Sequence, residues 1–104
     1  MTQQQLSEIL LELSHASRLV KSEADLRNIM EKYDLLFLGK DFNVIYASEL
    51  YNTLNKKYGI PVSEEDLNTL IPIVCPLLGM KVEPMKHLTD LNAPVPATYQ
   101  ITLW

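Results

Sequence analysis

The side chains best suited to chemistry in this chain are one cysteine and two histidines, and their spacing supplies no catalytic set. Nucleophilic catalysis needs a nucleophile, a base and an orienting group in one place. Cys75 falls on the apolar stripe of an expected helix, where burial raises the pKa of a thiol and makes it unreactive. His87 and Asp90 share an expected loop, but no serine or cysteine motif accompanies them. We therefore expect a protein that is not an enzyme.

The sequence also contains no pattern typical of a metal or cofactor site. A metal site would need His15, His87, Cys75 or carboxylates to converge, and they do not have the spacing of ligands. The chain has only three glycines, so a glycine-rich phosphate loop is absent from it. The three carboxylates at residues 64–66 are expected to be charges at a helix N-terminus rather than an acid–base pair. We expect neither a metal nor a cofactor.

The composition is that of a single globular domain inside the cell. The chain has 104 residues, of which 47% are apolar and 21% charged, which suits one domain with its own core. Its formal net charge of −4 repels nucleic acid and anionic lipid on average. A lone cysteine fits a reducing compartment, and the N-terminus lacks the pattern of a secretory signal. The longest uncharged stretch, residues 67–80, is too short to span a bilayer, so we expect a cytoplasmic protein without a membrane partner.

Hydrophobic periodicity divides the chain into four amphipathic helices and a few short strands. The expected helices cover residues 3–20, 22–34, 48–58 and 63–78. Each begins near a hydroxyl side chain that can cap it, and these caps are Thr2, Ser22, Ser48 and Ser63. The expected strands cover residues 80–83, 99–103 and either 42–46 alone or a hairpin that also includes 35–38. Pro72 and Pro76 are expected to kink the fourth helix, because proline removes a backbone N–H group and crowds the preceding turn.

From residue 42 to residue 104, this order of elements resembles a winged-helix domain, a helix-turn-helix variant in which two strands flank a loop called the wing. Residues 48–58 match the supporting helix, 59–62 the turn and 63–78 the recognition helix. Residues 80–83 and 99–103 match the wing strands, and 87–97 the wing tip. The resemblance implies a winged-helix-like α+β fold, with four helices and a small antiparallel sheet of two or three strands. Residues 1–34 are then an N-terminal helical extension of one domain, residues 1–104.

Many winged-helix domains bind DNA through the recognition helix, so the resemblance makes a dimeric DNA-binding transcriptional regulator the alternative function. Here that helix begins with three carboxylates at residues 64–66, and no Lys or Arg lies between Lys57 and Lys81. Duplex binding at physiological salt needs several cationic phosphate contacts, which disfavours this helix as a DNA reader. A contact led by the wing remains open, although the same cations are also ordinary solvated charges: Lys56, Lys57, Lys81 and Lys86, together with His87.

Apolar side chains outside the expected core favour a protein partner. Leu11 and Leu19 fall off the buried stripe of the first helix and flank His15, four residues from each, so the three form one row. A surface row of this kind is an apolar patch that a partner can cover. Packing of the second helix would cover it equally well. The row therefore predicts either a protein interface or a contact within the domain.

Two further features agree with a protein interface. Ile73 and Leu77 lie off the main apolar stripe of the fourth helix, and Trp104 lies on the strand face opposite the presumed core. Tryptophan is enriched at interface hot spots. We therefore expect a non-catalytic interaction module, accessory, regulatory or inhibitory, that binds a partner protein or forms a homodimer through its first helix. A third possibility is an acidic inhibitor that occupies a nucleic-acid-binding cleft.

Overall fold

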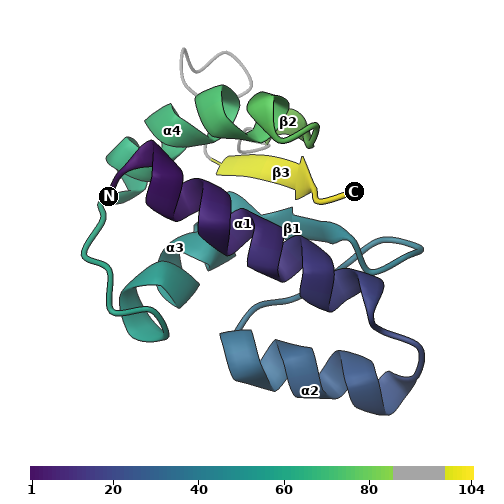
Figure 1. Ribbon diagram of the computed structural model, residues 1–104. Coiled ribbons are helices and arrows are strands. Elements are labelled where there is room, and N and C mark those ends of the chain that lie inside the picture. The colour runs from purple at the N-terminus through teal and green to yellow at the C-terminus, as the bar shows by residue number, and fades with distance from the viewer. Residues whose placement is uncertain (86–97) are drawn as a thin grey trace.

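The computed structural model describes residues 1–85 and 98–104, so the predicted wing tip at 87–97 lies outside the described residues. The described part has four helices and a three-stranded antiparallel sheet of order β1-β3-β2 (Figure 1). The elements are α1 (Gln3–Arg18), α2 (Glu23–Tyr33), β1 (Val44–Tyr46), α3 (Ala47–Lys56), α4 (Glu64–Leu77), β2 (Lys81–Met85) and β3 (Thr98–Thr102). The predicted α+β class, with four helices and a small antiparallel sheet, is confirmed.

Hydroxyl caps set the starts of three helices, as the sequence predicts. The Thr2 hydroxyl accepts a hydrogen bond from the Gln5 backbone N–H at 3.1 Å, and the Gln5 side chain accepts one from the Thr2 N–H at 2.9 Å. Ser22 and Ser63 each accept from the backbone N–H three residues later, also at 3.1 Å. These bonds satisfy donors that a helix leaves unpaired in its first turn, so α1, α2 and α4 begin where the sequence places them.

The predicted cap at Ser48 is wrong. The helix α3 follows β1 directly, and its N-cap residue is Tyr46, whose side chain makes no capping hydrogen bond. The Ser48 backbone N–H instead donates to the Thr98 hydroxyl on β3 at 2.9 Å. The unpaired donor at the start of α3 is therefore satisfied by a neighbouring strand, which a local sequence pattern does not reveal.

The helix α4 continues through both of its prolines rather than stopping before them. Pro72 and Pro76 are exposed on the outside of the helix. Each removes the N–H group that would bond the carbonyl four residues earlier, and on this outer side water can reach the freed carbonyls. Gly79 ends the helix with φ +74°, a left-handed conformation that suits glycine.

One apolar core unites the described elements. The large side chains with the lowest exposure come from every helix except α2, from β1 and β3, and from the loop before β1: Phe37, Leu6, Leu10, Leu13, Ile45, Leu50, Leu54, Leu67, Ile71, Ile101, Val74 and Thr53. The helix α1 lies across the centre of the molecule, between α4 and α2 (Figure 1). The segment expected to be an N-terminal extension thus supplies part of the core on which the rest of the chain packs.

The sheet is built around β3. Ile101 lies opposite Ile45 of β1 on one side and opposite Val82 of β2 on the other. The strand β2 is at the edge of the sheet, where Pro84 is tolerated because its missing N–H group is not needed by a further strand. For the first strand, the structure lies between the two predicted alternatives. A short strand β1 is present, and a single bridge joins its first residue, Val44, to Leu38.

A half-buried carboxyl lies where α3 faces the segment after α2. Glu49 Oε1 is buried and has no hydrogen-bond partner among the described residues. Burial raises the pKa of Glu49 above its ordinary value of 4.5, and the Asp34 carboxylate raises it further, while a hydrogen bond with the Leu36 backbone opposes the change. The folded state therefore holds the proton on Glu49 more tightly than the unfolded chain does.

We expect truncation of the α4 core to destabilise the domain strongly. Leu67 is 1% exposed, and Leu67→Ala should lower the free energy of unfolding by about 2–5 kcal/mol, the usual range for a buried leucine. Leu77→Ala, on the same helix but 78% exposed, is the matched control and should change it by less than ~0.5 kcal/mol. Urea denaturation followed by circular dichroism measures both. Equal losses for the two variants would contradict the helix orientation.

Replacing Glu49 should remove a pH-dependent loss of stability. A carboxyl whose pKa is raised on folding stabilises the protein below its unfolded pKa, and this contribution disappears as the pH rises through the folded pKa. We therefore expect Glu49→Gln to gain stability over the natural chain as the pH increases from about 4.5 to 7. Urea midpoints at several pH values measure this. Glu31→Gln, at an exposed position, is the control. A stability difference between Glu49→Gln and the natural chain that stays constant across the pH range would contradict the raised pKa of Glu49.

Candidate functional site

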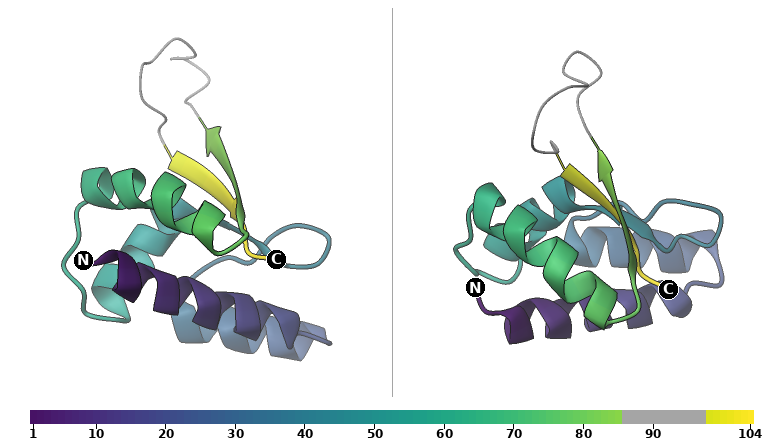
Figure 2. Two further views of the ribbon diagram at one scale, coloured as in Figure 1. Left: turned by 45° about the horizontal axis from the view of Figure 1, so that its top comes forward. Right: turned by 90° about the horizontal axis from the view of Figure 1, so that it is seen from above.

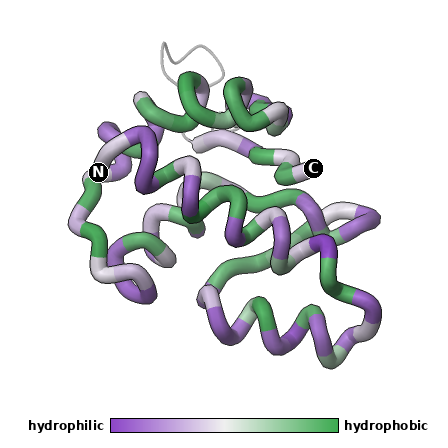
Figure 3. The backbone as a smooth tube through the Cα atoms, viewed as in Figure 1, coloured by the Kyte–Doolittle hydropathy of each residue, from purple (hydrophilic) through white to green (hydrophobic). Residues whose placement is uncertain are grey.

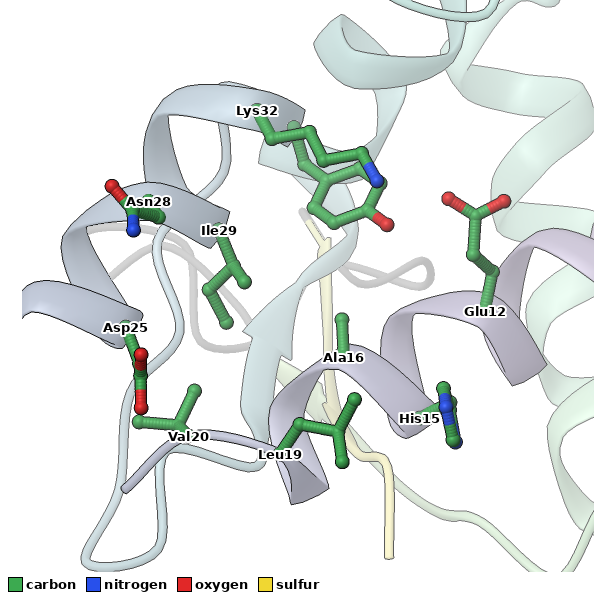
Figure 4. Close-up of a pocket in the computed structure, with 10 residues that line it drawn as sticks. Glu12, His15, Ala16, Leu19, Val20, Asp25, Asn28, Ile29 and Lys32 are labelled. Carbon is green, nitrogen blue, oxygen red and sulfur yellow. The ribbon is translucent and has the colours of Figure 1, made fainter. Parts of the chain in front are cut away.

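A groove of ≈530 Å³ lies between α1 and α2 (Figure 4). Two residues of the predicted interface, His15 and Leu19, line it. Ala16 and Ile29 extend into the space between the helices, with Leu19 and Val20 along one side (Figure 4). The complete lining is Glu12, His15, Ala16, Leu19 and Val20 from α1 and the residues after it, and Asp25, Asn28, Ile29, Lys32 and Tyr33 from α2.

The groove borders a helix whose apolar face is only partly covered by the core. Tyr33 is the buried residue of α2, and its backbone carbonyl accepts a hydrogen bond from the Thr53 hydroxyl of α3 at 2.7 Å. The other large apolar residues of the helix, Leu26, Ile29 and Met30, are only half-buried. An amphipathic helix with an incompletely covered face retains apolar surface that a ligand can bury.

A carboxylate held by tyrosines marks one end of the groove. The Tyr58 hydroxyl donates a hydrogen bond to Glu12 Oε2 at 2.9 Å. Burial, followed by a hydrogen bond with Glu12, raises the pKa of Tyr33 to about 12, so this hydroxyl stays protonated at neutral pH. Lys32 Nζ lies 5.2 Å from the centre of the Tyr33 ring. The Glu12 carboxylate at this end can accept hydrogen bonds from a basic group, while Leu19, Val20 and Ile29 offer apolar atoms farther along the groove, beside Asp25 and Asn28.

The predicted row on α1 is divided by its surroundings. Leu19 is 58% exposed beside the groove, so α2 lies next to it without covering it. Leu11 is 51% exposed and lines a separate shallow hollow with Ser14, His15 and Arg18. Only His15 borders both hollows among the residues that line them. The structure therefore places Leu11 and Leu19 at two neighbouring surfaces of α1.

Trp104 is fastened to α1 and is still 41% exposed. Its indole Nε1 donates to the Ser17 hydroxyl at 3.0 Å, and the Ser17 hydroxyl donates to the Phe42 carbonyl at 2.6 Å. The Arg18 guanidinium lies 5.5 Å from the centre of the indole ring. Asn43 Nδ2 donates to the Trp104 backbone carbonyl at 2.6 Å. The ring is thus held in one orientation, and sequence reasoning did not identify Ser17, Arg18 and Asn43 as its partners.

The described cations of the predicted nucleic-acid surface belong to different elements. Lys56 and Lys57 end α3, before α4 begins, whereas Lys81 follows α4 and forms an exposed ion pair with Glu83 at 3.1 Å. Lys86 and His87 lie outside the described residues. Lys56 and Lys57 are thus at the end of α3, and Lys81 is on the edge strand β2.

The single cysteine of the chain lies in the hydrophobic core. Cys75 is fully buried, and burial raises the pKa of its thiol to about 12.

Within residues 1–85 and 98–104, no three His, Cys, Asp or Glu side chains are grouped so as to hold a metal ion. Across the same ranges, none of the helices combines the length and apolar character needed to cross a bilayer. Comparisons with protein-family models, curated proteins and solved structures found no match.

We expect Ser17→Ala to loosen the attachment of Trp104. Ser17 is buried, and its removal leaves the indole N–H and the Phe42 carbonyl unpaired, at a cost of about 1–3 kcal/mol. Trp104 is the only tryptophan, so its fluorescence reports the change directly as a shift to longer wavelength. The control is Ser7→Ala, which removes only an exposed hydrogen bond to the Gln3 carbonyl. Identical spectra for Ser17→Ala and the natural chain would contradict the anchoring role.

Proposed function

We propose that this chain is a non-catalytic, winged-helix-like interaction module of the cytoplasm. In this proposal it acts as an accessory, regulatory or inhibitory subunit and receives a segment of a partner protein in the α1–α2 groove. The observation that carries the proposal is the groove itself, whose apolar wall includes Leu19, more than half exposed, and the half-buried Ile29. Concave apolar sites with a few fixed polar groups are the usual form of a binding site.

The winged-helix-like interpretation is supported by the order and pairing of the elements. The helices α3 and α4 are joined by a short connection, α4 leads into β2, and both β1 and β2 pair with β3. Glu64, Glu65 and Asp66 at the start of α4 would repel DNA phosphates from the N-terminus of the helix in the recognition position. We therefore favour a protein partner over a DNA duplex.

The groove favours a partner segment that is apolar with a basic residue at one end. Each large apolar side chain buried there contributes about 1.5–3 kcal/mol. A lysine or arginine of the partner can donate to the Glu12 carboxylate, whose position is already fixed by the Tyr58 hydroxyl. A preformed acceptor lowers the entropy lost on binding, which makes Glu12 the residue that would set the orientation of the segment.

Site-specific photo-crosslinking tests the proposal. A photoreactive residue at position 19, in tagged protein expressed in its own cells, should give one discrete adduct with a partner protein. The same residue at position 40, in the exposed turn before β1, is the control and should give none. Leu19→Asp should then raise the Kd for the purified partner at least about tenfold without lowering Tm, because Leu19 is largely exposed. Equal adducts at positions 19 and 40 would contradict the groove assignment.

A duplex-binding titration at several salt concentrations distinguishes the protein-binding module from the alternative function, a DNA-binding regulator. A regulator that contacts DNA through its wing should bind duplex with an affinity that falls steeply with salt, and Lys81→Glu should weaken that binding. We expect no binding at physiological salt for the natural chain. Micromolar binding that Lys81→Glu abolishes would support the DNA-binding regulator and contradict the protein-binding module.

A further inference from the structure

The outer face of α4 is apolar and uncovered by the described residues. The helix lies on the outside of the molecule, on the side away from α2 (Figure 2). Leu77 is 78% exposed, the highest value among the large apolar side chains that the structure describes, and Ile73 is 45% exposed. Pro72 and Pro76 lie beside them, and α4 carries one of the longest apolar stretches of the backbone (Figure 3). Exposed apolar side chains gathered on one helix face are typical of an interface.

The residues at the start of α4 and those just after its end carry opposite charges. Steps of four residues align Glu65, Thr69, Ile73 and Leu77 in one row along α4. The row thus begins with a carboxylate, and no charged residue occurs between Asp66 and Lys81. Lys81 follows the end of the helix as the first residue of β2, and its exposed ion pair with Glu83 contributes little energy that a new pairing would lose.

We propose that two copies of this chain associate through α4, with the two helices antiparallel about a two-fold axis at Ile73. Glu65 lies in the first turn of α4 and Lys81 follows the end of the helix, so an antiparallel pair brings the acidic first turn of each copy toward the Lys81 of the other. With the axis at Ile73, Thr69 of one copy lies opposite Leu77 of the other. A two-fold interface brings the same surface of both copies together, which requires a face that is complementary to itself.

Electrostatics favour this occupant and this orientation. Each copy carries a net charge of −4, so contact is least unfavourable where the surface between the ends is uncharged. The antiparallel arrangement places acidic first turns beside lysines and aligns the helix dipoles favourably. A parallel arrangement would place Glu64, Glu65 and Asp66 of both copies side by side. Pro72 and Pro76 lose almost no side-chain entropy when buried, which further favours association.

Sedimentation equilibrium of the full chain over a range of concentrations tests this proposal. The natural chain should show a reversible monomer–dimer equilibrium. Leu77→Glu should raise the dimer Kd at least about tenfold, since it removes apolar contact and adds charge near Glu65 of the other copy. Its circular dichroism melting curve, recorded at a concentration where both chains are monomeric, should be unchanged, because the side chain is exposed in the monomer. Leu11→Glu, at an exposed position of α1, is the matched control and should leave the dimer intact.

Charge reversal tests the antiparallel orientation. Glu65→Lys and Lys81→Glu should each raise the Kd about threefold or more at low salt, and the double variant should restore it. Failure of the double variant to restore association would overturn the antiparallel orientation. A chain that stays monomeric at every concentration, or a dimer weakened by Leu11→Glu and not by Leu77→Glu, would overturn the α4 interface. These results are independent of the α1–α2 groove, which shares no residue with α4.

Discussion

The rest of the structure depends on the burial of one face of α1. Leu6, Leu10 and Leu13 have no exposed surface, and they place α1 in contact with α4 across the centre of the domain. The following turn of α1 places Ser14 and Ser17 beside the C-terminal residues. The Ser14 hydroxyl donates a hydrogen bond to the Leu103 carbonyl, and the Ser17 hydroxyl accepts one from the Trp104 indole. These residues bury one face of α1. The opposite face borders α2 and the groove between the two helices.

The surfaces proposed for binding follow from this arrangement. On one side of α1, α2 is fixed through Tyr33 and leaves a groove with Glu12 at one end. On the other side, α4 buries Leu67 and Ile71 against the core and therefore turns Ile73 and Leu77 outward. Each proposed surface is thus the reverse face of an element whose inner face the core requires, and the two surfaces share no residue.

Local sequence patterns predicted most of the fold because the physical signals act over a few residues. Hydroxyl caps and apolar spacing of three and four residues located α1, α2 and α4, and alternation located β3 to within one residue at each end. The pattern failed at Ser48, where the helix start is satisfied by Thr98, a residue 50 positions away. Local rules cannot identify a partner that only the sheet brings near.

The sequence by itself determined the class of the fold, the burial of Cys75 and the acidic start of α4, because residue type and helical spacing suffice for each. It also singled out Leu19 and His15, since both lie off the buried stripe of their helix. Only the tertiary structure decided that α2 stands beside Leu19 without covering it, and that Trp104 is held by Ser17, 87 positions away. The physical reason is that a groove or a long-range hydrogen bond depends on the packing angle and position of whole elements, which the energy of the complete core sets.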